Sequence, residues 1–547
     1  MNGYWYPTDD TRPQTGADHL QEALQQIHKP LYLVGRPGGA PAVAQSGAVI
    51  LDGQPPQATN TLPLQAQAAP LPLENLGDPG FKAAFGLRYA YICGAMANGI
   101  TSVEMVTKAG RAGMIGFFGA AGLPLEAVER AIDRLRTVTP EIPYGFNLIH
   151  SPNDMALERA VVDLYLRRGV SKVSASAYLD LTLPLVYYRI KGIHTDASGN
   201  AVCPNKVIAK VSRMEVASRF LAPPPDKYLV PLVERGLISD SEAALAKQVP
   251  MADAISAEAD SGGHTDNRPA LALLPTLLAL RDESMAQHGF SRPIPVGLGG
   301  GIATPDAAAA AFAMGAAYVL TGSVNQACLE AGTCEAVRKM LAEAQQADVI
   351  MAPAADMFEL GVKVQVLKRG TMFAMRAAKL YELYNTYPGF DALPPADRKF
   401  VEGQLLKSGF HAAWEQTKAF FQERDPAQID RARQDPKHKM ALVFRSYLGQ
   451  TSRWAVTGEA DRQIDYQIWC GPAMGAFNAW TRGSFLAEPQ HRDIVTVAYN
   501  LLFGAAVLIR SQQLRYQGAH LPTQLGRIRP MRTDAIATYC PDLSRSS

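Results

Sequence analysis

Apolar and polar positions alternate in a regular rhythm between about residues 87 and 347 of the chain. Short apolar runs predict buried strands, and the stretches between them carry apolar residues at helical spacing, as in residues 125–138. Strands that alternate with helices predict a parallel sheet. Eight such units over roughly 250 residues predict an α/β fold, the (β/α)₈ TIM barrel. The predicted strands are residues 89–93, 114–118, 143–148, 170–174, 206–211, 252–258, 293–298 and 317–321.

The alternative to a barrel is a doubly wound open sheet. A dinucleotide-binding sheet of that kind carries the motif GxGxxG after its first strand, and this chain has no such motif there. In a barrel, the functional groups lie at the carboxyl ends of the strands and in the loops that follow. Candidate chemistry is therefore expected at these positions.

The regions on either side of the barrel have other patterns. Residues 30–34 and 47–51 predict short strands, and residues 54–80 are rich in Pro, Gln and Ala, which favours a linker. The segment after residue 350 predicts a helical domain packed against the barrel mouth. The predicted divisions are a small N-terminal β-rich unit with its linker (1–80), the barrel (81–349), a helical C-terminal substrate domain (350–520) and a basic tail (521–547). Helices are expected at residues 325–347, 372–384, 397–408, 411–423 and 492–516.

Composition and charge narrow the function classes. The 547 residues include 53 Lys and Arg against 51 Asp and Glu, and this balance argues against a protein built to bind nucleic acid. The six cysteines form no CxxC pair, so neither a disulfide framework nor a metal site is predicted and a reducing cytoplasm is the expected location. The longest apolar stretch, residues 498–509, is interrupted by Asn500 and is shorter than a membrane span. No signal-like segment is found, and a soluble protein is expected.

Two glycine motifs follow the last two predicted strands. Gly300 and Gly301 belong to a glycine run after the seventh strand, and Gly322 and Ser323 follow the eighth. These two loops form the usual phosphate site of a barrel, because glycines let backbone N–H groups approach the phosphate. The simpler interpretation is that the glycines only form tight turns. The pair of motifs at this spacing favours phosphate binding.

A histidine follows the sixth predicted strand in the segment Ser-Gly-Gly-His. Gly262 and Gly263 would let the backbone lie close to a flat ligand, and His264 would project into the barrel mouth. A histidine there can give or take a proton near neutral pH. The alternative is a loop histidine bonded to backbone. His150, after the third strand, has a similar position without flanking glycines.

Three further signals lie at strand ends. The segment Ala95-Met96-Ala97 follows the first strand, Asn147 lies near the end of the third and Lys210 near the end of the fifth. An amide and a cation there could bind the pyrimidine edge of a flavin, with Lys210 stabilising negative charge on the reduced ring. The simpler interpretation of the first two signals is that Ala95-Met96-Ala97 forms a turn and that Asn147 caps a strand end. A lysine inside an apolar strand needs a partner, because burying an unpaired ammonium is costly.

In this order the motifs resemble a known superfamily. AMANG, GFN, a strand-end lysine, SGGH, GGGI and TGS are similar to the FMN-dependent nitronate monooxygenases and enoyl reductases. The helical C-terminal extension is most similar to the PfaD-type trans-acting enoyl reductases of polyunsaturated fatty acid synthases and trans-acyltransferase polyketide synthases. The resemblance covers about residues 30–520. One departure is Ala95-Met96-Ala97, where simpler relatives have Pro-Met-Ala.

The resemblance implies a function. FMN would lie on the barrel mouth with its phosphate at Gly300, Gly301, Gly322 and Ser323. NADPH would supply the hydride, and an enoyl thioester on an acyl carrier protein would receive it, with His264 as the proton donor or an orienting group. The helical domain would line the acyl tunnel. Its position alone also suggests a docking face for the carrier protein, with exposed cations such as Lys407 and Arg445 as contacts. The sequence leaves the oligomeric state open, and a homodimer is one assembly that it allows.

Two other functions remain open at this point. A nitronate monooxygenase would use the same flavin and histidine with oxygen. A non-catalytic barrel could bind a phosphorylated ligand or act as a scaffold within a megasynthase. An inosine-phosphate-type dehydrogenase is disfavoured, because no cysteine lies in a loop suited to nucleophilic attack and Cys328 falls in the eighth helical pattern.

Overall fold

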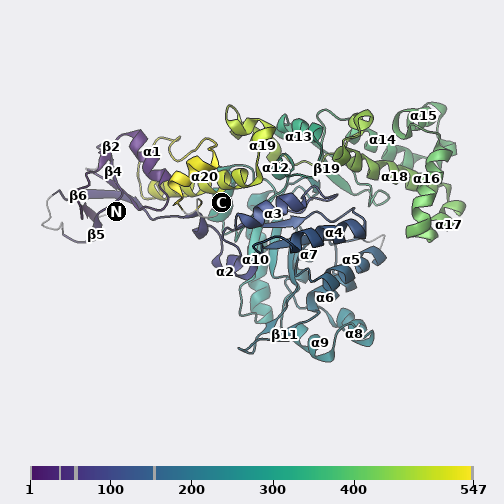
Figure 1. The fold of residues 1–547 in the computed structure, drawn as a ribbon, viewed down its shortest axis with the longest axis horizontal. Helices are drawn as coiled ribbons and strands as arrows, with labels where there is room; N and C mark the ends of the chain where they lie inside the picture. Colours follow the sequence, from purple (N-terminus) through teal and green to yellow (C-terminus); the bar gives the residue numbers. More distant parts are fainter. Residues whose placement is uncertain (1–2, 36–38, 55–59, 152–154, 542, 544–547) are drawn as a thin grey trace.

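The computed structural model describes residues 3–35, 39–54, 60–151, 155–541 and 543. Eight parallel strands close into a barrel at the centre of the molecule (Figure 1). Each predicted barrel strand is present with ends displaced by a few residues, so the predicted fold class is confirmed. In barrel order the strands are β10 (Lys172–Ser176), β13 (Lys206–Val211), β14 (Ala254–Glu258), β16 (Val296–Gly299), β17 (Val319–Thr321), β7 (Tyr91–Cys93), β8 (Ile115–Phe118) and β9 (Tyr144–Ile149).

Helices surround the barrel because its strands are apolar on both faces. All residues of β7, β8, β14 and β16 are buried, as in parallel sheets covered by helices. The helices of this layer are α3 (Val103–Arg111), α4 (Leu125–Arg136), α5 (Met155–Arg168), α6 (Leu183–Ile190), α7 (Met214–Phe220), α8 (Asp226–Glu234), α9 (Asp240–Ala246), α10 (Ala270–His288), α11 (Pro305–Ala313), α12 (Ser323–Gln326) and α13 (Glu335–Ala342).

The last barrel helix is interrupted. Residues 325–347 were expected to form one helix, but the chain leaves α12 after Gln326 and starts α13 at Glu335. Between them, Gly332 packs on the loop after β7, where an added Cβ would lie 2.2 Å from the carbonyl oxygen of Gly99. This close approach requires a turn that the helical spacing of the sequence does not reveal.

The N-terminal unit is a six-stranded sheet with the strand order β2-β4-β3-β6-β1-β5. Its two predicted strands are present, but the predicted linker is wrong because it contains β6, which pairs with both β3 and β1. The sequence LPLQAQA of β6 alternates buried and less buried positions, and its Pro, Gln and Ala residues conceal the strand pattern. Part of the expected linker, residues 55–59, lies outside the described residues. The strands are β1 (Gly3–Tyr6), β2 (Gln14–Thr15), β3 (Leu31–Val34), β4 (Ala42–Ala44), β5 (Ala48–Leu51) and β6 (Leu62–Ala68).

The long helix α20 (Ile494–Tyr516) was predicted as a helix, but its place in the fold was not. It packs on α11, β6 and α1 (Ala17–Gln25) rather than at the barrel mouth (Figure 1). Gly504 permits the contact with α11, since a Cβ there would lie 2.6 Å from side-chain atoms of Pro305. By length and composition α20 could cross a membrane, although the sequence predicted an apolar stretch too short for this. In the structure, 83% of the apolar 18-residue stretch of α20 is buried inside the protein.

Arg510 on α20 fixes the N-terminal unit to the rest of the chain. Its guanidinium is fully buried and donates hydrogen bonds to the carbonyl oxygens of Ala23, Leu24, Gln26 and Lys29, at 2.7–3.2 Å. These carbonyls lie at and beyond the C-terminus of α1, where a helix leaves them without partners of its own.

We expect Arg510→Met to lower the free energy of unfolding by about 3 kcal/mol, because the carbonyls of Leu24 and Lys29 lose the donor that Arg510 supplies. The carbonyls of Ala23 and Gln26 each keep a second donor. Urea denaturation followed by circular dichroism measures this change. The control Arg482→Met removes an exposed arginine and should change stability by less than about 0.5 kcal/mol. Equal stability of the two variants would contradict the role given to Arg510.

The C-terminal region contains a β-hairpin and a helical lobe. The hairpin strands β18 (Val349–Pro353) and β19 (Lys363–Leu367) were missed by the sequence, which predicted mainly helices here. The predicted helices 372–384 and 411–423 are present, whereas 397–408 becomes α15 followed by a π-helical segment (Val401–Leu406). The lobe comprises α14 (Phe373–Thr386), α15 (Pro395–Phe400), α16 (Phe410–Arg424), α17 (Pro426–Gln434) and α18 (Pro436–Thr457), and α19 (Ala473–Thr481) follows it.

Candidate functional site

A cavity of about 540 Å³ lies at the carboxyl ends of the barrel strands. The barrel loops form its floor, and segments 354–364 and 445–473 contribute its roof. Its size is typical of small-molecule and cofactor sites. All twelve predicted site residues line this cavity: Ala95, Met96, Ala97, Asn147, Lys210, Gly262, Gly263, His264, Gly300, Gly301, Gly322 and Ser323.

The glycines after β16 and β17 form an open cradle. Gly300 has φ +86°, and a Cβ there would lie 2.6 Å from the carbonyl group of Ala259, so only glycine fits. Gly301 and Gly322 face open space. The hydroxyl of Ser323 accepts a hydrogen bond from the backbone N–H of Gly471 at 3.0 Å, and its own proton can still be donated. Backbone N–H groups and a hydroxyl are suitable donors for a phosphate.

The segment after β7 is held in one conformation. The hydroxyl of Thr101 accepts from the backbone N–H of Met96 at 2.9 Å and donates to the carbonyl oxygen of Gly94 at 2.7 Å. Gly119 lies against the same segment, where a Cβ would collide with the carbonyl oxygen of Met96. The backbone at Ala95-Met96-Ala97 is therefore fixed without the proline of simpler relatives.

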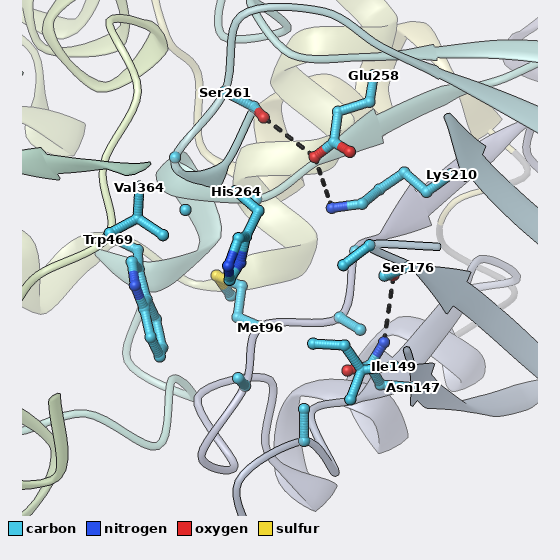
Figure 2. Close-up of a pocket in the computed structure, with 18 of the residues that line it drawn as sticks. Met96, Asn147, Ile149, Ser176, Lys210, Glu258, Ser261, His264, Val364 and Trp469 are labelled. Atoms are coloured by element: carbon cyan, nitrogen blue, oxygen red, sulfur yellow. Dashed lines mark hydrogen bonds and ion pairs between the residues drawn. The ribbon is translucent and has the colours of Figure 1, made fainter. Parts of the chain in front are cut away.

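Lys210 has the partner that its position requires. Its Nζ lies 2.7 Å from Oε1 of Glu258, which also accepts a hydrogen bond from the hydroxyl of Ser261 at 3.2 Å (Figure 2). The side chains of Lys210 and Glu258 are 25% and 11% exposed. Because the cavity is on one side of this pair, the ammonium is available to a ligand. Glu258 was not predicted as a site residue, although it is the last residue of the neighbouring strand.

Asn147 points into the same cavity from β9. Its amide nitrogen donates to the carbonyl oxygen of Ser174 at 3.2 Å and to the hydroxyl of Ser176 at 3.3 Å. In Figure 2, Asn147 and Ser176 lie beside Ile149 on the barrel floor. These hydrogen bonds fix the amide orientation and leave its oxygen as an acceptor.

His264 lies on a strand and not in a free loop. β15 (Gly263–His264) pairs antiparallel with β19, with His264 opposite Val364, and completes a three-stranded sheet with β18. The ring projects into the cavity near Trp469 and Met96 (Figure 2). Its Nε2 lies 3.3 Å from Oδ1 and 3.2 Å from Oδ2 of Asp356. The interpretation of a histidine bonded only to backbone is therefore wrong.

Charge and burial act in opposite directions on His264. Burial lowers its pKa, but the hydrogen bond and charge of Asp356, with the charge of Glu258, outweigh burial and raise the pKa above its usual value. The carboxylates thus extend the pH range over which the imidazolium form persists. A protonated histidine in this place can donate a proton.

Gln365 and several contacts at the site could not be found from the sequence. Gln365 donates to Asp260 Oδ1 at 2.7 Å and to the carbonyl oxygen of Ser261 at 2.8 Å, which ties β19 to the segment before β15. Gly262 lines the cavity, but its lack of a side chain also serves packing, since a Cβ would lie 2.8 Å from the backbone nitrogen of Cys470. None of these contacts has a local sequence signal, because each joins segments about 100 or more residues apart.

The two cations suggested for carrier-protein contact have other roles. Arg445 donates to the carbonyl oxygen of Ala355 at 3.1 Å, pairs with Glu359 at 3.2 Å and lines the cavity. Lys407 donates to the carbonyl oxygen of Asp461 at 2.6 Å. The Arg445 side chain is 18% exposed and faces the cavity, whereas the Lys407 side chain remains 39% exposed. The contact of these cations with a carrier protein stays a prediction. Over the described residues, no group of three or more His, Cys, Asp or Glu is arranged to hold a metal ion.

The barrel and its cavity define the class of protein. The nitronate monooxygenase family model matches residues 82–387, more than half of the chain. A second model, the inserted helical domain of [acyl-carrier-protein] S-malonyltransferase, matches residues 387–466, which include much of the helical lobe. The chain therefore belongs to the nitronate monooxygenase family, in the branch that contains the enoyl reductase domain of MlnA.

The solved relative that places it there is the enoyl reductase domain of MlnA from the macrolactin biosynthesis cluster of Bacillus amyloliquefaciens. It is 37% identical with a TM-score of 0.76, and the match covers 82% of this chain and 99% of that one. A polyunsaturated fatty acid synthase subunit of Thraustochytrium sp. is 44% identical over 91% of this chain and 33% of its own length. Polyketide biosynthesis protein PksE of Bacillus subtilis is 44% identical over 82% of this chain and 58% of its own length. The chain thus spans less than two thirds of these two curated relatives. The motif resemblance is confirmed, and this family implies a flavin-dependent oxidoreductase.

Proposed function

We propose that the protein is a trans-acting enoyl reductase that uses FMN and NADPH. Its substrates are enoyl thioesters on acyl carrier protein in polyketide or polyunsaturated fatty acid biosynthesis, and it reduces their α,β-double bond. The observation that supports this most is a single cavity that combines the glycine cradle, the Lys210 ammonium and the His264–Asp356 pair. The likeness to an enoyl reductase domain over nearly all of that domain supports the same assignment.

The cradle residues fit a flavin nucleotide. Backbone N–H groups near Gly300, Gly301 and Gly322 and the hydroxyl of Ser323 would hold the phosphate. Lys210 and Asn147 would bind the pyrimidine edge of the ring, and the fixed segment Ala95-Met96-Ala97 would support it. Bound FMN would supply hydride transfer, which no side chain provides.

The remaining residues act on the substrate. His264 projects into the cavity and would give a proton to the α-carbon of the thioester. Trp469 and Val364 close the cavity from the roof side (Figure 2), so that the acyl chain lies against apolar side chains and the double bond is oriented. The roof comes largely from the C-terminal region, in keeping with an added substrate domain.

The cellular setting is part of the proposal. We propose acyl carrier protein domains of a modular synthase as partners, since one curated relative is named as a polyunsaturated fatty acid synthase subunit and another as a polyketide biosynthesis protein. We propose neither nucleic acid nor a membrane as a partner; the near balance of basic and acidic residues supports the first of these exclusions. We also propose that the enzyme is cytoplasmic and acts as a homodimer.

A visible absorption spectrum tests the cofactor assignment. The purified protein should be yellow and should bleach when NADPH is added without oxygen. A yellow protein that ignores NADPH favours the monooxygenase alternative or NADH as the donor. A colourless protein that cannot be reconstituted with FMN would overturn the flavin assignment and favour a scaffold role.

We expect Gly322→Ala to weaken FMN binding without weakening the fold. A methyl group at Gly322 meets no protein atom within 4 Å, and the backbone has negative φ, so the variant should unfold at the wild-type urea concentration. The methyl would occupy space beside the phosphate, and the dissociation constant measured by flavin fluorescence should rise by about tenfold or more. Gly300→Ala is the contrasting variant, since its Cβ would collide with Ala259 and destabilise the apoprotein. Unchanged FMN affinity in Gly322→Ala would argue against a phosphate at this loop.

A further inference from the structure

The hairpin β18–β19 brings a carboxylate to the catalytic cavity. Asp356 lies in the connection between these strands, and β19 pairs with β15, which carries His264. His264 thus lies in this three-stranded sheet, and Asp356 lies three residues beyond the end of β18, in the connection to β19. The sheet brings the two residues close together, and their side chains, 30% and 52% exposed, meet at the cavity wall.

The geometry distinguishes the two ring nitrogens of His264. Nε2 faces both carboxylate oxygens of Asp356 at 3.2–3.3 Å. Within the part of the chain that the structure describes, Nδ1 makes no hydrogen bond to protein. When one ring nitrogen is bonded to a carboxylate, the tautomer and the ring orientation are set, and the other nitrogen becomes the reactive one.

The charged groups around the ring come from three elements. Asp356 belongs to the β18–β19 connection, Glu258 to the end of β14 and Lys210 to the end of β13. Burial and Lys210 act against the imidazolium, and the two carboxylates favour it with the larger combined effect. Since Glu258 is already paired with Lys210, Asp356 is the carboxylate in direct contact with the ring.

We propose that Asp356 is a positioning residue that holds the Nε2 proton of the His264 imidazolium, so that Nδ1 delivers the proton to the α-carbon. This inference rests on the proposed function and deepens it. As hydride joins the β-carbon of the enoyl thioester, the electron pair of the double bond forms a new bond from the α-carbon to the Nδ1 proton. The Nδ1–H bond breaks, and His264 is left neutral with its Nε2 proton still bonded to Asp356. Solvent then restores the proton on Nδ1.

The proposal predicts a specific pH dependence for Asp356→Asn. The asparagine keeps the size of the side chain but removes the charge, so the pKa of His264 falls and the imidazolium is lost at lower pH. The kcat values of variant and wild type should be similar near pH 6, and the variant should be about tenfold or more slower near pH 8. Asp356→Glu should restore much of the rate at the higher pH. A purely structural role would give the same ratio of rates at every pH.

Glu359→Gln is the matched control, because it removes a carboxylate from the same connection that pairs with Arg445 and not with His264. Its pH profile should match that of the wild type. A second readout is independent of turnover: histidine-labelled FMN-bound protein, with the His264 resonance assigned by its loss in His264→Gln, should show a lower His264 pKa in Asp356→Asn.

Two results would overturn the inference: a ratio of rates that does not change with pH, or an unchanged His264 titration in Asp356→Asn. Failure of the proposed function looks different. If the wild-type protein reduces no enoyl thioester, that function and the donor role of Nδ1 are both lost, whereas the titration still decides whether Asp356 holds the ring.

Discussion

Replacing His264 by glutamine should slow turnover by about 10²–10³-fold, because a positioned proton donor contributes about this much to a rate. The slower rate should appear in the second half-reaction, the reduction of the enoyl thioester, and not in the first, the reduction of the enzyme by NADPH. Anaerobic reduction of the enzyme by NADPH needs hydride transfer but no proton to carbon, so its rate should stay close to that of the wild type. Reoxidation of the reduced enzyme by an enoyl thioester should carry the whole defect. Stopped-flow absorbance measures the two halves separately.

His288→Gln is the matched control for this experiment. His288 is an exposed residue at the C-terminal end of α10, and its loss should leave both half-reactions unchanged. If His264→Gln slowed NADPH oxidation as much as thioester reduction, the histidine would be acting on cofactor placement. If neither half-reaction changed, His264 would have no part in the chemistry.

The second large effect is expected for Lys210→Met, which removes one member of a mostly buried ion pair. Among the described residues, the Ser261 hydroxyl would then be the one group left in hydrogen-bond contact with the Glu258 carboxylate. We expect a loss of about 2 kcal/mol in the free energy of unfolding. The FMN dissociation constant should rise by about tenfold to a hundredfold, since a charged hydrogen bond to the ring is lost.

The double variant Lys210→Met with Glu258→Gln separates these two effects. Removing both charges should recover at least half of the lost stability, because no unpaired carboxylate remains in the cavity. FMN binding should stay weak, since the cation is still absent. Recovery of FMN affinity in the double variant would contradict a direct contact between Lys210 and the flavin.

Much of this site could be predicted, because in a barrel the local sequence pattern of each strand also gives the place of the residues at its carboxyl end. Each strand has its own apolar signal, and closure brings all carboxyl ends to one face, so His264, Lys210 and Gly300 meet although they are distant in sequence. The short helix-forming and glycine-rich segments between strands carry equally local signals. For these elements no knowledge of tertiary contacts was needed.

The parts that were missed depend on pairing between distant segments. β6 is a strand because β1 and β3 lie on either side of it, and its own composition does not favour one. β19 becomes part of the site only by pairing with β15, about 100 residues earlier. The same is true of Asp356, which acts through its contact with His264, and of α20, which packs on α11 and β6. The pattern of a single sequence does not identify these neighbours.

The most direct test of the account is to reoxidise the NADPH-reduced holoenzyme without oxygen by an enoyl thioester on an acyl carrier protein. The account predicts that the flavin absorbance returns, with one saturated thioester formed for each cofactor oxidised. A reduced enzyme that ignores the thioester but turns over a nitronate with oxygen would contradict the proposed function and identify a monooxygenase.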